Sequence, residues 1–220
     1  MYQQLPRNYG AATVSTPALL GQVLGITGAG FLITAAGAYL TASLALPQGV
    51  SFGAMLIGFL FLIGINAQRG NPAVSLVLFY IFTFLEGVGI GPTVSHYARL
   101  DGPEVVLNAA ATTGLGMFVL GGIAFLTSFD YRKLQGYAFA GLILLVVVGL
   151  ISAFTHFLHP ATYAWLTLLV FAVLVLVDFA RIKNGGDGLS PVQIATSIYL
   201  DAINIFLAIL RLTGSRSRDD

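Results

Sequence analysis

The sequence contains no cysteine and very little charge. Without cysteine, the 220-residue chain has no disulfide, no thiolate nucleophile and no cysteine-based metal site. Charged residues make up 9% of the chain, whereas an ordinary soluble domain contains about 25%. The formal net charge is only +1, and the few basic residues are scattered, so the composition gives no indication of a nucleic-acid partner. These deficits exclude a disulfide scaffold and argue against a soluble domain.

Apolar residues dominate instead. Hydrophobic residues make up 57% of the chain, and they occur in runs of about 20 residues, the length that crosses a bilayer as a helix. The 26 glycines suit close helix packing in lipid. We therefore predict an all-α membrane protein with one seven-helix domain, 19–212, between a short cytoplasmic N-terminal tail, 1–18, and a C-terminal tail, 213–220. The predicted helices are 19–46, 50–67, 73–97, 105–129, 136–158, 162–182 and 190–211.

The seventh predicted helix is more polar than a helix that faces lipid. It carries Asp201 near its middle and Asn204 about one turn later. A charge at mid-membrane costs about 2.5–3.5 kcal/mol on insertion scales, so such a residue rarely faces lipid. We therefore predict that this helix lies in the centre of the bundle, surrounded by the other six, with Asp201 facing the protein interior.

Lysine and arginine residues predict the orientation. Cytoplasmic loops carry an excess of these residues, and a cytoplasmic N-terminus leaves only Arg99 in the outer loops. A fully spanning seventh helix places Arg216 and Arg218 outside, against the rule. We predict a cytoplasmic N-terminus in a bacterial inner membrane. The inner side then holds Arg7, Arg69, Arg132, Lys133, Arg181 and Lys183.

This orientation brings three charged residues toward the cytoplasmic end: Arg69 after the second helix, Asp178 near the end of the sixth, and Asp201 in the seventh. Two carboxylates at close range in a low dielectric cannot both stay ionised, so the pair would titrate together. Arg69 would favour the charged form of the aspartate that it pairs with. An Arg69–Asp178 pair that loosens when the aspartate is protonated is a pH-controlled latch.

Simpler interpretations stay open for several of these residues. Asp178 is equally consistent with a solvated charge at the membrane interface, and Arg69 alone with a positive-inside anchor. Glu86 either lines a water-filled path or is a protonated carboxyl bonded to a neighbouring helix. Asn204 is a candidate for a hydrogen bond across helices and, like Glu86, for lining a pore. We predict no metal site and no cofactor.

Three segments resemble the Bax inhibitor-1, or transmembrane Bax inhibitor motif, family in its bacterial form: FTFLEGVGIGPTVSHYA at 82–98, VLVDFARI at 175–182 and SIYLDAINIFLAILRL at 197–212. The resemblance implies a calcium-permeable, pH-gated leak channel rather than an enzyme. It implies that Asp178 and Asp201 form the proton sensor and that Arg69 latches the closed state. The implied partners are calcium as permeant ion, protons and the lipid bilayer.

Two other classes compete with a channel. Aspartyl intramembrane proteases also place two aspartates on consecutive helices, but they carry GxGD around the second aspartate and a later PAL. Here the second aspartate stands in YLDAIN and no PAL follows. A proton-coupled transporter would use Glu86, Asp178 and Asp201 as a relay. Saturable, proton-driven uptake of an organic substrate would favour it over a leak.

Overall fold

A computed structural model describes residues 15–216. In this part of the chain seven α-helices follow one another, and all seven are long and apolar enough to cross a membrane. The prediction of an all-α, seven-helix membrane protein is confirmed. The predicted tail residues 1–14 and 217–220 lie outside the described residues. The helices are α1 (Thr16–Ser43), α2 (Gln48–Ala67), α3 (Pro72–Leu100), α4 (Pro103–Leu126), α5 (Tyr131–Thr155), α6 (Pro160–Lys183) and α7 (Pro191–Arg216), with a short 3₁₀ turn, η1 (Gly186–Gly188), between α6 and α7.

Local capping sets helix ends that hydrophobicity alone misplaces. The Asp130 side chain accepts a hydrogen bond from the Lys133 amide at 3.2 Å, so α5 begins five residues before the predicted position 136. At the start of α7, Ser190 and Gln193 cap each other: the Gln193 amide donates to the Ser190 hydroxyl, and the Ser190 amide donates to the Gln193 side chain. This helix continues to Arg216, five residues past the predicted end.

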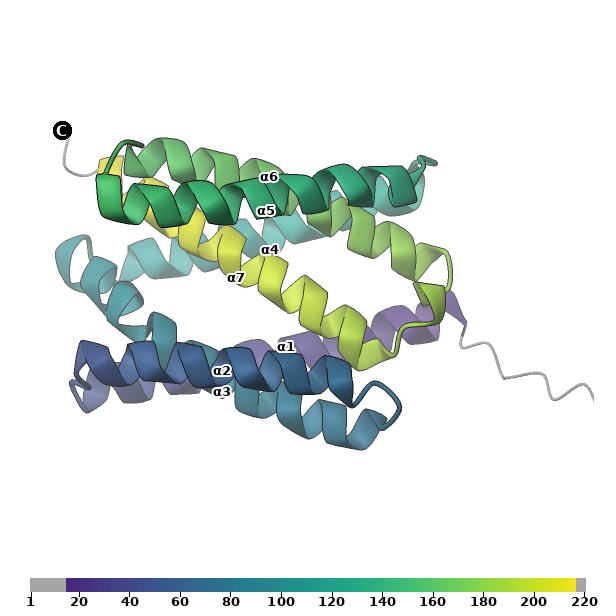
Figure 1. Ribbon diagram of the computed structural model, residues 1–220, viewed down its shortest axis with the longest axis horizontal. Coiled ribbons are helices and arrows are strands. Elements are labelled where there is room, and N and C mark those ends of the chain that lie inside the picture. The colour runs from purple at the N-terminus through teal and green to yellow at the C-terminus, as the bar shows by residue number, and fades with distance from the viewer. Residues whose placement is uncertain (1–14, 217–220) are drawn as a thin grey trace, which may run out of the picture.

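The helices form two groups of three with α7 between them (Figure 1). In the first group α3 packs against α1 and α2, and in the second α6 packs against α4 and α5. α7 runs obliquely through the bundle and packs against α6, α4, α1 and, less extensively, α3 (Figure 1). The prediction that all six other helices surround it is wrong, because α2 and α5 lie on the outer sides of their groups and make no substantial contact with it. α7 is the most buried of the seven helices, as its polar residues predicted.

The contact between α1 and α3 depends on glycines. A Cβ on Gly37 of α1 would lie 2.5 Å from the Phe84 carbonyl oxygen, and one on Gly87 of α3 would strike the Thr34 carbonyl oxygen. Only hydrogen at these positions lets the two backbones approach so closely. α3 continues through Pro92, and its C-terminal part bends toward α4 (Figure 1).

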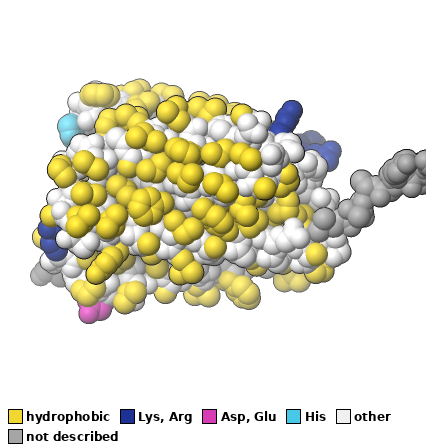
Figure 2. Space-filling view, turned by 90° about the horizontal axis from the view of Figure 1, so that it is seen from below, with side chains coloured by type: hydrophobic (Ala, Val, Ile, Leu, Met, Phe, Trp, Pro, Cys, Tyr) yellow, Lys and Arg dark blue, Asp and Glu magenta, His cyan; other side chains and the backbone are white. Residues whose placement is uncertain are grey.

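Charge gathers at the two ends of the molecule. Figure 2 shows hydrophobic side chains across the middle of one face, while the charged side chains visible there lie at the ends. The end where α1 begins also holds the end of α2, the start of α5 and the α6–α7 loop (Figure 1). The basic residues predicted for the inner side that the structure describes therefore share one end: Arg69, Arg132, Lys133, Arg181 and Lys183.

Candidate functional site

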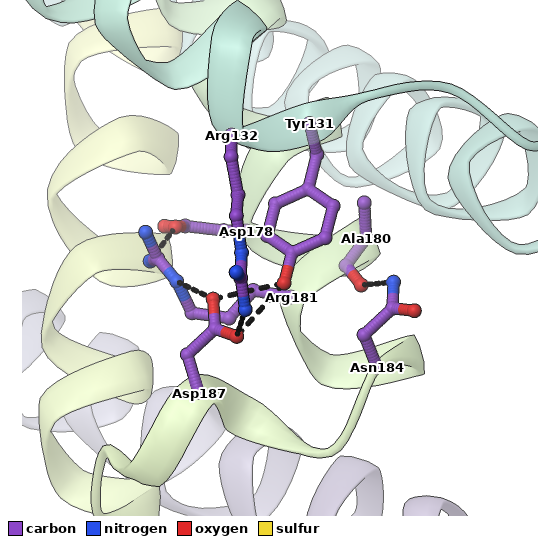
Figure 3. A network of polar contacts seen from close by, with 7 residues as sticks. All are labelled: Tyr131, Arg132, Asp178, Ala180, Arg181, Asn184 and Asp187. Atoms are coloured by element: carbon purple, nitrogen blue, oxygen red, sulfur yellow. Dashed lines mark hydrogen bonds and ion pairs between the residues drawn. The ribbon is translucent and has the colours of Figure 1, made fainter.

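Asp178 lies on α6, five residues before the helix ends at Lys183. It is buried, and its Oδ1 accepts a 2.6 Å hydrogen bond from the guanidinium of Arg181, one turn later on the same helix. Arg181 is buried as well. Figure 3 shows the two side chains pointing toward one another. A short, charge-assisted bond in a dry environment holds both charges in place.

Asp201 of α7 reaches the same region from the neighbouring helix. It is buried, as predicted from its mid-helix position. The two carboxylates lie close enough to repel each other, and Arg181 attracts both. Ser197, one turn before Asp201, places its hydroxyl beside Asp178. The oblique course of α7 (Figure 1) explains the meeting, because ten residues along a tilted helix gain less depth than about 1.5 Å each.

Each of the two aspartates has one carboxylate oxygen that accepts no hydrogen bond from the described residues. Oδ2 of Asp178 and Oδ2 of Asp201 are buried and have no hydrogen-bond partner within the described residues. A buried carboxylate oxygen without a donor is costly if the group is charged. The site therefore has unused capacity for a proton or a cation.

Arg69 does not form the predicted pair with Asp178. It lies exposed on the turn after α2, and Arg181 occupies the position beside the carboxylate instead. The reason is lateral placement: α2 packs against α3, on the outer side of the first three-helix group, and makes no substantial contact with α6 or α7. The sequence placed both residues at the correct end of the bundle, but equal depth does not bring two helices side by side.

A third carboxylate, Asp187 in η1, extends the site to the surface (Figure 3). The Tyr131 hydroxyl donates to its two oxygens at 2.8 and 3.0 Å, and Arg132 donates to Oδ1 at 3.1 Å. Arg181 Nε lies 3.8 Å from the other oxygen, Oδ2. Sequence reasoning missed Asp187, although an acidic residue flanked by three glycines in GGDG was a usable signal.

Glu86 and Asn204 lie apart from the aspartate–arginine cluster. Glu86 of α3 is half-buried, and its charge acts on Tyr199. The Tyr199 and Thr34 hydroxyls form a 2.6 Å hydrogen bond, and the Thr34 hydroxyl also lies within hydrogen-bond distance of the Gly30 and Thr83 carbonyls. Asn204 donates to the Leu200 carbonyl of its own helix at 2.8 Å, rather than across helices as we considered.

A separate apolar cavity of about 710 Å³ lies between α1, α3, α4 and α7. Ala202 and Phe206 line it, whereas Asp178, Asp201 and Glu86 do not. Within the described part of the chain, no three histidine, cysteine, aspartate or glutamate side chains cluster so as to hold a metal ion. The aspartate–arginine cluster and the apolar cavity are therefore separate features of the structure.

Comparisons with known proteins agree with this architecture. The family model described as "Inhibitor of apoptosis-promoting Bax1" matches residues 16–218, which include all seven helices. A Vibrio cholerae protein described as an uncharacterized membrane protein is 31% identical over 173 residues, 74% of this chain and 73% of that relative. A similarly described Streptococcus pyogenes serotype M1 protein is 30% identical over 175 residues, 75% of this chain and 74% of the relative. A Neisseria meningitidis serogroup A protein is 26% identical over 223 residues, 97% of both chains. The chain therefore belongs to the Bax inhibitor-1 family of membrane proteins.

Proposed function

We propose that this protein is a pH-sensitive cation leak of the membrane, and that calcium is its permeant ion. The observation that carries the proposal is the buried cluster of Asp178, Arg181 and Asp201 on two adjacent membrane-spanning helices. Ionisable groups inside a membrane protein mark ion or proton pathways by default. This cluster holds two carboxylates against one guanidinium, so its net charge depends on how many protons it binds.

The proposed gate is the Asp178–Arg181 ion pair, in place of the Arg69–Asp178 pair that the sequence suggested. When Asp178 is ionised, the 2.6 Å pair holds the Arg181 side chain in its buried position on α6, from which its charge also attracts Asp201 of α7. Proton uptake by Asp178 removes the partner charge and weakens the contact, because the attraction between two opposite unit charges is lost. Leak therefore increases as pH falls.

Carboxylate oxygens also make calcium a suitable permeant ion. Calcium is a hard cation that prefers oxygen ligands, and rings or rows of carboxylates select cations in channels. Asp201 supplies such an oxygen deep in α7, and its Oδ2 has no hydrogen-bond partner among the described residues. In our proposal the protein is not an enzyme, and it lies in a bacterial inner membrane with its N-terminus in the cytoplasm.

Calcium flux into liposomes that contain the purified protein and a trapped calcium dye tests this proposal across a pH series. We expect leak from the parent to rise as pH falls, and the Asp201→Asn variant to lose most of this pH response. Glu104→Gln is the matched control, because it neutralises an exposed carboxylate at the other end of the bundle. Absence of flux from the parent at every pH, or an unchanged pH response in Asp201→Asn, would contradict the proposal.

A further inference from the structure

Arg181 lies between two carboxylates on opposite sides of it (Figure 3). One nitrogen bonds the buried Asp178 at 2.6 Å, and Nε lies 3.8 Å from Asp187 in the α6–α7 loop. A guanidinium presents five N–H donors in a fixed fork, so it serves two carboxylates at once. The two contacts are unequal, because the bond to Asp178 is shorter and drier: a quarter of the Asp187 side chain is exposed to solvent.

The backbone around Asp187 adds independent evidence. Four consecutive residues, 185–188, have positive φ angles between 53° and 87°, and Asp187 is the only one that is not glycine. Glycine adopts this conformation without cost, whereas other residues adopt it rarely. A non-glycine residue in a left-handed position is a reason to look for a role of its side chain. Here the turn directs the Asp187 carboxylate back onto Arg181.

Asp187 also fastens the loop to α5. Tyr131 is buried and donates to both oxygens of the carboxylate, while Arg132 donates from the surface. The loop is thus held at two points, on α5 through this carboxylate and on α6 through Arg181. The short backbone hydrogen bond from Leu189 to Gly186 closes the turn itself.

We infer that Asp187 is a further carboxylate partner for Arg181, besides Asp178 and Asp201, one that fastens the α6–α7 loop over the aspartate pair and keeps Arg181 in an ion pair when Asp178 is protonated. A buried guanidinium that loses its hydrogen-bonded carboxylate partner is destabilising. With Asp187 in place, protonation of Asp178 leaves Arg181 beside another carboxylate, so the proton is taken up more easily. The effect on leak rests on the proposed function, whereas the fastening and the proton uptake do not.

The charged and titratable groups around Arg181 are consistent with this exchange of partners. α7 contributes Asp201, and α5 contributes Tyr131 and Arg132. Lys183, at the end of α6, is directed away and donates to the Thr127 carbonyl at 2.7 Å. α1 presents only the Thr16 hydroxyl, which donates to the Lys183 carbonyl. Asp187 is therefore the carboxylate, besides Asp178 and Asp201, that faces Arg181 in the described structure.

Hydrogen–deuterium exchange of residues 184–190 tests the fastening without any measurement of leak. Asn tolerates the left-handed conformation as Asp does, so Asp187→Asn removes the charge and spares the backbone. We expect amide exchange in this loop to become about tenfold faster, as loss of a charge-assisted hydrogen bond predicts. Asp130→Asn is the matched control, since Asp130 is an exposed carboxylate at the same end that pairs with Lys133 at 3.7 Å. Tyr131→Phe removes one donor to Asp187 and should accelerate exchange to a smaller extent.

Infrared titration of the protonated carboxyl band, assigned with Asp178→Asn, tests the exchange of partners. In Asp187→Asn the midpoint of the Asp178 titration should move to lower pH by about one unit, a tenfold loss of proton affinity. Asp130→Asn should leave it unchanged. An unchanged midpoint together with unchanged loop exchange in Asp187→Asn overturns the inference. If the shifts occur but no variant or parent conducts calcium, the inference stands and the proposed function fails.

Discussion

A buried guanidinium is stable only beside a carboxylate, and this requirement separates two arginines at the same end of the bundle. Arg181 is buried between Asp178 and Asp187, while Arg69 is exposed on the turn after α2. The same substitution therefore has different consequences at the two positions. Removing the first leaves a carboxylate buried and uncompensated, and removing the second changes only a solvated surface.

We expect Arg181→Gln to lower the free energy of unfolding by about 3–5 kcal/mol, as loss of one member of a buried ion pair does. Arg69→Gln should change it by less than about 0.5 kcal/mol. The double variant Asp178→Asn with Arg181→Gln should recover part of the loss, because it removes both members of the 2.6 Å pair and leaves neither of them buried alone. Denaturant unfolding of the purified proteins measures all three. Equal stability of the two single variants would show that the buried ion pair does not contribute to the free energy of unfolding.

Sequence reasoning identified the aspartates but not the arginine. Asp201 stands out because an ionisable residue in the middle of a membrane-spanning helix marks a functional site by default. Asp178, near the end of the sixth helix, is equally consistent in sequence with a solvated charge, and the family resemblance implies its role. Arg181 sits in the last turn of α6, where a basic residue is also expected as an interfacial anchor. An interfacial anchor and a buried ion-pair partner differ only in which face of the helix Arg181 occupies. In the structure it lies on the inward face, one turn after Asp178.

At the scale of the elements, the close crossing of α1 and α3 means that a Cβ is tolerated at some glycines of these helices and not at others. A Cβ on Gly87 would strike the backbone of α1, which cannot move aside locally, whereas a Cβ on Gly28 of α1 meets nothing within 4 Å. Glycine in an open helix position is less favourable than alanine by up to about 1 kcal/mol. A Gly→Ala substitution should therefore lower the stability of the protein at Gly87 and leave it unchanged or raise it at Gly28.

We expect Gly87→Ala to destabilise the protein by about 1–3 kcal/mol, the range for overpacking, and Gly28→Ala to be neutral or slightly stabilising. Gly89→Ala is an intermediate case, because its Cβ would meet the flexible Met55 side chain of α2. Thermal unfolding in detergent ranks the three variants. A Gly87→Ala variant as stable as Gly28→Ala would mean that α1 and α3 separate freely.

The number and order of the helices follow from the sequence because a span of about twenty apolar residues has few alternatives in lipid. The helix ends do not follow, since caps such as Asp130 and the Ser190–Gln193 pair act through specific hydrogen bonds. The sequence predicted α7 in the centre of a ring of six helices, whereas it packs mainly against α6, α4 and α1. Which helices surround it depends on side-chain fit, which hydrophobicity does not encode.

For the whole molecule, the gathering of basic residues at one end predicts the orientation in the membrane. Because the sequence contains no cysteine, a single introduced cysteine is the only thiol that can be labelled. Gln48 and Gln68 flank the two ends of α2 and are both exposed. In intact bacterial spheroplasts, Gln48→Cys should react with a membrane-impermeant maleimide and Gln68→Cys should not. Inverted vesicles should give the opposite pattern, and reaction of Gln68→Cys in intact spheroplasts would place the N-terminus outside.

The central position of α7 has a consequence for biosynthesis. The ribosome releases α1–α6 first, so the two three-helix groups enter the membrane before the helix that lies between them exists. During that interval Asp178 and Arg181 are present in the nascent protein and Asp201 is not. A chain that stops before residue 191 therefore lacks the helix that packs against both groups, and its Asp178–Arg181 pair lacks its α7 neighbour. Synthesis of α7 supplies these contacts, so the native packing of the two groups is complete only after its 26 residues have been translated.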